Sequence, residues 1–335
     1  MFPAATNRAQ RILTQLELAE SLGLNRKRLL QASGLQESDI SDPDNRVPVI
    51  KAVRMLQTMV AETGDLDLGL RLGELARVKE GGVAGYAMIH SELLLGATRR
   101  LVRFRKIFNQ RLEFDLHKDK DRWRLSFETE PLVEGFRPPL DDYMAAIVVV
   151  FGELIGKKII PAEVSFLYAK PQNLSLHREL FGSNIHFDRP MQEIVFWDRD
   201  LQTPLQEADP QLTKYLDELA EIRLGTLPKD DTFAGRVRRA VWPHLSEGQP
   251  TINNISVDLA VSSRTLQRRL REERTSYGEV VETLRKEKAV LLLTDRNLAV
   301  YEVGYLLGYS DPSAFYRAFR RWHGKSPSKY RQLIS

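Results

Sequence analysis

The sequence predicts an α+β N-terminal domain, made of helices and a small antiparallel sheet, followed by an all-α domain with two helix-turn-helix units. Three observations lead to this fold class. Apolar residues recur at helical spacing from residue 8 to about residue 75. The period changes to two between Leu112 and Phe127, as in a hairpin with one buried face. A helical pattern entered through a tight turn then occurs twice after residue 250.

Composition places the chain among globular proteins. Its 335 residues are enough for two domains, and 42% of them are apolar, with the charges well mixed. The lack of cysteine excludes a disulfide framework, thiolate metal sites and thiol catalysis, and suits a reducing, cytoplasmic setting. The longest apolar run, Ala145–Phe151, is too short to span a bilayer, and the N-terminus lacks the apolar core of a signal peptide. We therefore expect no membrane partner.

The first 110 residues are expected to be mostly helical. Two helical patterns, residues 12–22 and 48–64, each end at a glycine, a common helix terminator. The glycine-rich segment 81–85 has the wrong spacing for a phosphate-binding loop, so we interpret it as a flexible entry to a helix beginning near Tyr86. The helix expected over Ala97–Asn109 has a basic side. That side is either a second nucleic-acid contact or, as the acidic remainder of the domain favours, a solvated face.

A small sheet is expected after these helices. Its hairpin turns at Lys118–Asp121, and the very apolar helix over Pro139–Gly156 is expected to be central. A helix over Asp217–Leu227 closes the domain. The other predicted elements are strands at 164–168, 185–187 and 194–197 and a short helix at 174–181.

The chain lacks the sequence patterns of an enzyme or a metal site. Neither H-x-H or H-x-x-x-H pairs nor a G-x-S-x-G elbow occurs. The adjacent acids Asp141 and Asp142 are better explained by the positive end of a helix dipole than by catalysis. We therefore expect no catalytic residues, no cofactor and no bound metal. One aromatic stripe either lines a pocket for a small or apolar effector or, as is more common, forms core; its members are Phe114, Trp123, Phe127 and Phe166.

Charge divides the chain in two. Residues 233–335 carry 18 lysines and arginines against 10 acidic residues, a balance of +8, whereas residues 1–232 carry 31 against 35. Only the C-terminal part is therefore suited to a polyanion. A Gly-Thr-Leu-Pro stretch followed by charge indicates a linker at the same place. We expect an N-terminal domain at 1–225, a linker at 226–232 and a second domain at 233–335.

The end of the chain has the pattern of a helix-turn-helix. Gly308 allows a tight turn, Ser310 is the expected N-cap of the next helix, and Pro312 suits its first turn. The apolar stripe of that helix consists of Ala314, Phe315, Ala318, Phe319 and Trp322.

The same pattern occurs once earlier. Residues 255–262 match residues 303–310 in order, so that Ala260 stands in the turn and Ser262 caps the helix after it. A helical period over Tyr277–Leu293 joins the two copies. Two units on one rigid helix suit duplex DNA, because its major groove repeats about every 10 base pairs.

Polar side chains face away from the apolar stripes of both second helices. Arg can bond guanine and Gln can bond adenine at the base edges, whereas the arginines and lysines further along the second unit are better placed to hold phosphates. The expected base readers are Arg264, Gln267, Arg268, Arg271, Ser313, Tyr316 and Arg317. The expected phosphate contacts are Arg320, Arg321, Lys325 and Lys329.

Two stretches carry a family resemblance. TLQRRLREE at Thr265–Glu273 and GYSDPSAFYRAFRRWHGKSPSKYR at Gly308–Arg331 resemble the AraC/XylS transcription regulators over roughly the last hundred residues. Two positions depart from that family: Ser256 stands where Ala is usual, and Ala260 where the turn often has Gly. Ala260 is slightly strained if its turn needs a positive φ. A looser likeness over residues 181–210 links the N-terminal half to the arabinose-binding-like domain of one branch of this family.

The resemblance implies a sequence-specific regulator with several partners. These are double-stranded promoter or operator DNA, a small-molecule effector, a second copy of the chain and RNA polymerase. The alternative is an effector-binding or scaffold protein whose basic C-terminal domain meets an acidic protein partner. The doubled unit favours DNA, because a protein partner has no reason to require two equivalent basic helices on one strut.

Overall fold

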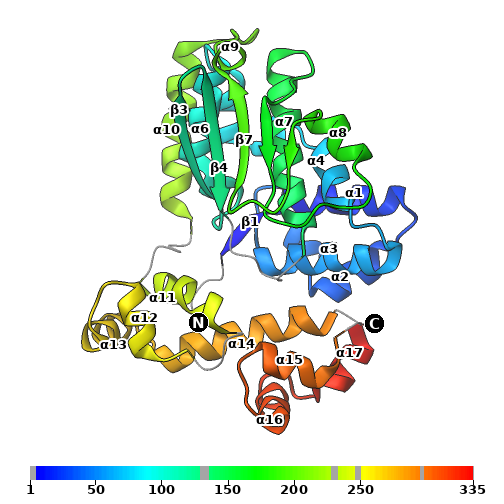
Figure 1. Ribbon diagram of the computed structural model, residues 1–335, viewed down its shortest axis with the longest axis vertical. Helices are drawn as coiled ribbons and strands as arrows, with labels where there is room; N and C mark the ends of the chain where they lie inside the picture. Colours follow the sequence, from blue (N-terminus) through cyan, green and yellow to red (C-terminus); the bar gives the residue numbers. More distant parts are fainter. Residues whose placement is uncertain (1–4, 129–135, 228–232, 246–249, 295–297, 335) are drawn as a thin grey trace. The chain divides into compact units, whose positions relative to one another are not determined.

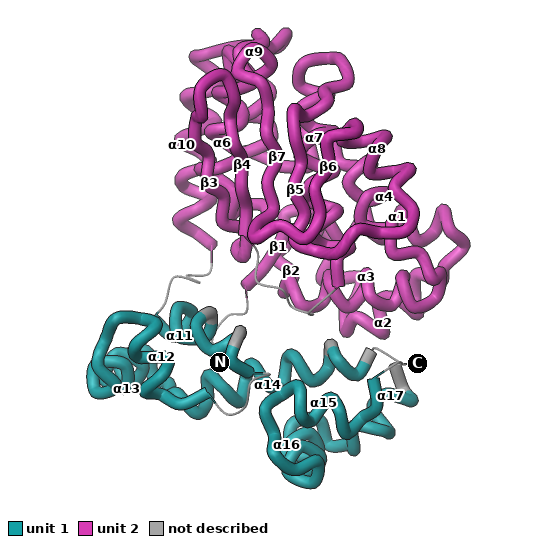
Figure 2. The backbone as a smooth tube through the Cα atoms, viewed as in Figure 1, with its two compact units in different colours: residues 1, 132–134, 229–335 teal, residues 2–131, 135–228 magenta. Residues whose placement is uncertain are grey.

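The chain forms two compact units (Figure 2). One comprises residues 2–131 and 135–228, and the other is built on residues 229–335. We call them the N-terminal unit and the C-terminal unit. The computed structural model describes residues 5–128, 136–227, 233–245, 250–294 and 298–334.

The N-terminal unit begins with helices and a two-stranded sheet (Figure 1). β1 (Thr6–Arg8) pairs antiparallel with β2 (Arg46–Pro48). The sequence did not reveal this sheet, because three residues are too few to show a period of two. This region is mostly helical, as predicted, and its helices are α1 (Gln10–Ser21), α2 (Arg26–Ser33), η1 (Glu37–Ile40), α3 (Val49–Thr63), α4 (Leu68–Glu74), η2 (Val78–Gly81), α5 (Val83–Ile89) and α6 (Leu94–Phe108).

A five-stranded sheet in the order β3-β4-β7-β5-β6 completes this unit. The predicted hairpin consists of β3 and β4. All neighbouring strands of this sheet pair antiparallel except β5 and β6, which run parallel. α8 connects β5 to β6, and a helical crossover of this kind is what a parallel pair needs. The bounds are β3 (Glu113–Asp119), β4 (Arg122–Glu128), α7 (Pro138–Ile155), β5 (Glu163–Ser165), α8 (Ser175–Phe181), β6 (Ile185–His186), β7 (Gln192–Trp197), α9 (Asp198–Leu201) and α10 (Pro210–Thr226).

One core of the N-terminal unit lies between α7 and the sheet, and a second lies among α1, α2, α3 and α4. The ring centroids of Phe151 on α7 and Phe196 on β7 are 5.2 Å apart. Phe127 and Phe166 from the predicted aromatic stripe are buried in the same core. α7 is therefore the central helix, as its unbroken apolar run predicted.

The prediction of a flexible glycine-rich entry was wrong. η2 ends at Gly81 and α5 already begins at Val83, three residues before the predicted start. A Cβ on Gly81 would lie 2.6 Å from the Phe108 ring. Gly82 has a φ of +59°, and a Cβ there would lie 2.6 Å from the Arg8 guanidinium. These glycines therefore allow two side chains to pack against the backbone.

The helix-dipole account of Asp141 and Asp142 was incomplete, because both are buried at the start of α7. Arg137 Nη1 donates to Asp141 at 2.8 Å, and the Tyr168 hydroxyl donates to the same carboxylate. Arg11 Nε donates to Asp142 at 2.9 Å. Buried carboxylates need such partners to offset the loss of water.

The basic side of α6 is neutralised within the N-terminal unit. Arg100 Nε and Nη2 donate to Asp217 on α10 at 2.9 and 2.8 Å. Arg103 forms an ion pair with Glu221 on the same helix at 2.5 Å. The partly buried Arg100–Asp217 pair argues against a second nucleic-acid contact on this side of α6. α10 is longer than predicted and runs from Pro210 to Thr226, so that it includes the first residue of the expected linker.

The C-terminal unit is helical and contains two helix-turn-helix pairs joined by α14 (Figure 1). The pairs are α12 with α13 and α15 with α16. Several apolar residues of α14 are buried, including Leu284 and Leu293. The bounds are α11 (Phe233–Val241), η3 (Pro243–Leu245), α12 (Ile252–Asp258), α13 (Ser263–Glu272), α14 (Tyr277–Thr294), α15 (Val300–Leu306), α16 (Pro312–His323) and α17 (Pro327–Ile334).

Candidate nucleic-acid interface and a cavity in the N-terminal unit

α13 presents a polar face because its apolar residues are four apart. Leu266 and Leu270 are fully buried. Ser262 is the N-cap, and its hydroxyl accepts from the backbone N–H of Thr265 at 3.1 Å. The four predicted readers of this helix are all exposed: Arg264, Gln267, Arg268 and Arg271.

α16 has the same design but a different cap. Phe315 and Phe319 are buried, and the N-cap is Asp311 rather than the predicted Ser310. Its carboxylate accepts from the backbone N–H of Ser313 at 3.0 Å and of Ala314 at 3.2 Å. These bonds hold the pKa of Asp311 below its usual value. The correction arises because the second turn is one residue longer than the first.

Counting from the N-caps places the four predicted readers of α13 opposite three predicted readers of α16 and one predicted phosphate contact, Arg320. Arg264, Gln267, Arg268 and Arg271 correspond in order to Ser313, Tyr316, Arg317 and Arg320. Of the second set, Tyr316 alone is half-buried, because its ring packs against Phe315. Lys325 and Lys329 lie beyond α16 and are exposed. The assignment of these residues to DNA stays a prediction.

The turns of the two helix-turn-helix pairs have the same backbone hydrogen bond. Ala260 N–H bonds to Val257 O at 2.9 Å, and Gly308 N–H bonds to Tyr305 O at 2.8 Å. Both residues have a positive φ, 52° for Ala260 and 74° for Gly308. The positive φ expected for this turn is therefore present, and Ala260 adopts it despite its Cβ. Ser256 fits the first unit, since its hydroxyl is buried and donates to Ile252 O at 2.7 Å.

Two of the predicted contact arginines are already paired. Arg268 forms an ion pair with Glu272 one turn later, at 2.5 Å. Arg321 pairs with Glu282 on α14, also at 2.5 Å. Hydrogen bonds from Trp322 and Arg321 lower the pKa of that glutamate. Within the described residues, the side chains of Arg264, Arg271, Arg317 and Arg320 have no ion-pair partner. Exposed pairs of this kind contribute only about 0–1 kcal/mol, so DNA phosphates can replace them.

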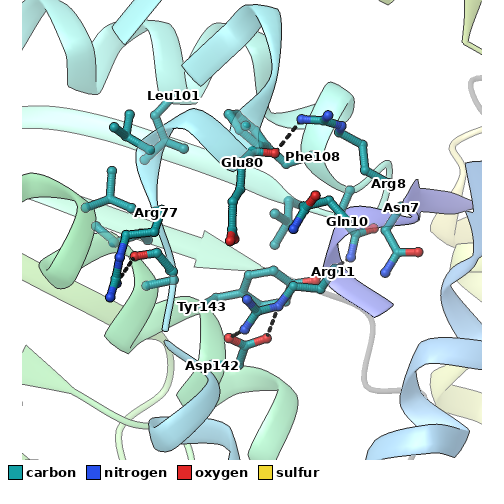
Figure 3. Close-up of a pocket in the computed structure, with 18 of the residues that line it drawn as sticks. Asn7, Arg8, Gln10, Arg11, Arg77, Glu80, Leu101, Phe108, Asp142 and Tyr143 are labelled. Atoms are coloured by element: carbon teal, nitrogen blue, oxygen red, sulfur yellow. Dashed lines mark hydrogen bonds and ion pairs between the residues drawn. The ribbon is translucent and has the colours of Figure 1, made fainter. Parts of the chain in front are cut away.

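The N-terminal unit contains a cavity of about 160 Å³ (Figure 3). Its wall is apolar, and its polar end includes the Arg11–Asp142 pair and Glu80. Of the predicted aromatic stripe only Phe114 lines it, while Phe127 and Phe166 belong to the core. Trp123 instead donates through Nε1 to Asp198 at 2.7 Å. The aromatic stripe is thus mostly core, and the cavity is lined by Phe114 and by residues of α7.

Comparison with known families identifies the chain. The arabinose-binding domain of the AraC transcription regulator matches residues 23–205, which is more than half of the chain. A helix-turn-helix domain matches residues 255–333. The chain belongs to the AraC family of transcription regulators. As an AraC-family regulator it combines an arabinose-binding-like domain with the DNA-binding helix-turn-helix type seen in its two pairs.

Regulators of known name show how far the likeness extends. An ornithine utilization regulator from Pseudomonas aeruginosa is 29% identical over 318 residues, which cover 95% of this chain and 94% of that protein. The regulator VirS from Mycobacterium tuberculosis is 29% identical over 285 residues, or 83% of this chain and 82% of its own. The crystal structure of the transcriptional regulator CdpR from Pseudomonas aeruginosa is 22% identical, with a TM-score of 0.44 over 91% of this chain and 96% of that chain.

Sequence reasoning missed the residues that hold the second helix-turn-helix of this regulator in place. Arg285 on α14 donates to Leu307 O at 2.9 Å and to Gly308 O at 3.2 Å. Its guanidinium lies 4.6 Å from the centroid of the Tyr309 ring. A lone Arg inside a helical pattern carries no sign of such a contact, because carbonyl acceptors in a turn leave no trace in the sequence.

Two further findings apply to the described part of the chain. There, no helix is long and apolar enough to cross a membrane. The same residues contain no cluster of three or more histidine or acidic side chains that could hold a metal ion.

Proposed function

We propose that this AraC-family regulator binds a specific DNA sequence through α13 and α16. The observation that carries the proposal is the equivalence of the two helices. Arg268 and Arg271 on α13 occupy the same positions, counted from the cap, as Arg317 and Arg320 on α16. α14, which joins the two pairs, has 18 residues and is therefore ~27 Å long, close to the ~34 Å repeat of the major groove.

We assign roles to the side chains from their position along the helix and from the charges beside them. Arg320 is equivalent to Arg271 in position but adjoins Arg321, so we group these two neighbouring arginines as phosphate contacts. Near the N-terminus of a recognition helix, side chains reach base edges, and further along they meet the backbone. We assign base contacts to Arg264, Gln267, Arg268, Arg271, Ser313, Tyr316 and Arg317. We assign phosphate contacts to Arg320, Arg321, Lys325 and Lys329.

We further propose that the N-terminal unit forms a homodimer through α10. Four large side chains on its outer face are exposed by 38 to 65% and are spaced three, four and three residues apart, as in a coiled-coil seam. Glu218 and Arg223 flank this seam five residues apart, in positions that pair across a parallel dimer. The seam, which we call the α10 seam, consists of Leu212, Tyr215, Leu219 and Ile222.

The other partners are proposed on the family alone. The N-terminal unit would sense a small-molecule effector, and the cavity beside α7 supports this role because its lining residues all belong to this unit. Contact with RNA polymerase has no separate support in the structure. The competing function, an acidic protein partner for the C-terminal unit, does not account for two equivalent helices.

Salt dependence and two variants test the DNA proposal. We expect the affinity of the full chain for a DNA site selected from a random pool to fall linearly with the logarithm of salt concentration. Arg268→Ala should cost about 1–3 kcal/mol at selected base positions, whereas Lys329→Ala should weaken all sequences alike and reduce the salt slope by about 1.

The outcomes separate the two candidate functions. If Arg268→Ala weakens every sequence equally, Arg268 holds a phosphate and reads no base. If DNA affinity is low and hardly depends on salt while an acidic protein binds tightly, the scaffold function replaces the regulator proposed here.

A further inference from the structure

The cavity of the N-terminal unit has an apolar body and one charged end (Figure 3). Its volume of about 160 Å³ is close to that of cavities that hold a benzene-sized molecule. Tyr143, Ala146 and Val150 lie on one face of α7 and form the floor. The remaining apolar lining includes Val78, Met88, Phe108 and Phe151.

Two of the arginines at the charged end already have acidic partners. Arg11 donates to Asp142 through Nε at 2.9 Å. Arg8 forms an ion pair with Asp44 at 2.5 Å and donates to the backbone oxygen of Glu80. Neither guanidinium therefore calls for an anionic ligand.

The carboxylate of Glu80 differs from these groups because, among the described residues, it forms no direct ion pair; Arg11, which is already bonded to Asp142, and Arg77 act on it only through their charge. Its side chain extends into the cavity toward Arg11 and Asp142 (Figure 3). In the described part of the chain its carboxylate accepts only from the Thr14 hydroxyl, at a long 3.5 Å, and from the backbone N–H of Arg77. Partial burial raises the pKa of Glu80, although the charges of Arg11 and Arg77 oppose this shift. A carboxylate at the end of an apolar cavity is stabilised by a ligand cation.

We propose that this cavity binds a small organic cation, a primary ammonium on an apolar body, with Glu80 as the counter-ion. The inference rests on the proposed effector role of the N-terminal unit and adds the chemical class of the effector. The apolar wall supplies most of the burial, and Glu80 selects the charge. An ammonium can donate three hydrogen bonds, so the backbone carbonyls around η2 can complete its shell.

Three probes of equal size test the charge selection in the full chain. Benzylamine, benzyl alcohol and benzoate share one ring and carry a cationic, a neutral and an anionic group respectively. By calorimetry at pH 8, we expect benzylamine to bind at least tenfold more tightly than benzyl alcohol, and benzoate to bind more weakly than both. If benzoate binds best, the arginines determine the ligand and the proposal is overturned.

Two variants and one control locate the site. Glu80→Gln should reduce benzylamine binding to the level of benzyl alcohol and leave benzyl alcohol unchanged. Glu74→Gln is the matched control, because burial also raises the pKa of Glu74 but it does not line the cavity. Ala146→Leu should weaken benzylamine and benzyl alcohol alike by more than fivefold. Unchanged selectivity in Glu80→Gln, or unchanged binding in Ala146→Leu, overturns the proposal.

A separate measurement keeps this inference apart from the proposed function. The affinity of the wild-type chain for DNA is measured without any amine. Loss of amine selectivity with intact DNA binding removes only the ligand class, whereas failure of DNA binding with intact amine selectivity removes only the regulator function.

Discussion

At the scale of single residues, the two turns differ in backbone strain. Ala260 and Gly308 occupy the same place with positive φ, and a Cβ in that region costs roughly 1–2 kcal/mol. Ala260→Gly should therefore stabilise the C-terminal unit by about 0.5–1 kcal/mol, after the entropy cost of a glycine is deducted. Gly308→Ala should destabilise it by about 1 kcal/mol.

Urea unfolding of the two variants measures both changes. Gly308→Val should cost more than Gly308→Ala and should also reduce DNA affinity about as far as Arg317→Ala, because α16 would be displaced. Equal DNA affinity for wild type and Gly308→Val would mean that α16 does not enter a groove.

A second residue-scale effect lies in the buried cluster of Asp141, Tyr168 and His177. The Tyr168 hydroxyl donates to Asp141 and lies 3.0 Å from His177 Nε2. Burial raises the pKa of Asp141 to about 7 and lowers the pKa of His177 to about 4. Between about pH 4 and 6.5 the folded state keeps the Asp141 proton that the unfolded state loses, so this carboxyl makes stability fall as pH rises. His177 has the opposite effect, because the unfolded state binds its proton.

Removing one residue of this pair should leave the pH dependence of the free energy of unfolding that the other residue causes. In Asp141→Asn, the free energy of unfolding should rise from pH 4.5 to 6.5, by at most about 1.4 kcal/mol per pH unit, relative to wild type. In His177→Gln it should fall over the same range. Denaturant unfolding at four pH values measures this, with the exposed His117→Gln as control. Slopes of the same sign in both variants would contradict the opposing pair.

At the scale of elements, the α10 seam makes the proposed dimer testable. Leu219 and Ile222 are 54 and 65% exposed, so Leu219→Glu and Ile222→Glu should change the stability of one chain by less than about 0.5 kcal/mol. Across a dimer interface, however, each substitution places two carboxylates in an apolar seam. We expect sedimentation to show a dimer for wild type and a monomer for either variant.

The control for the α10 seam is Leu66→Glu, because Leu66 is 50% exposed on the same unit but belongs to no seam. It should leave the dimer intact. A wild-type chain that stays monomeric at high concentration, or a dimer that survives both seam variants, would remove α10 as the interface.

At the scale of the whole molecule, the two helix-turn-helix pairs should act as one rigid reader. Arg285 on α14 donates hydrogen bonds to Leu307 O and Gly308 O in the turn between α15 and α16, which links the two pairs. Inserting five base pairs between the two subsites of a selected DNA site moves one of them to the opposite side of the duplex. We expect affinity on that DNA to fall to the level of one pair, and Arg317→Ala to have little further effect. Undiminished affinity after the insertion would show that the pairs move independently.

The local pattern was enough to predict most elements and which face of α13 and of α16 is buried. Leu266 and Leu270 in α13, and Phe315 and Phe319 in α16, lie four apart, and this spacing alone decides which side is buried. The error at Ser310 was also one of local counting. Ser262 lies four residues before the first buried leucine of α13, Leu266. The residue four positions before Phe315, its equivalent in α16, is Asp311.

Contacts between segments that are distant in the chain could not be predicted from the sequence. Asp142 bonds to Arg11, and Glu80 lies near the same arginine without a direct ion pair, only because α1, η2 and α7 pack together. These three elements also line the cavity. Helical spacing determined by itself that this chain carries two equivalent basic helices, because the period of an α-helix is a property of adjacent residues. Tertiary structure alone decided which charges are paired, since ion pairing depends on residues far apart in the chain and on how much water burial removes from them.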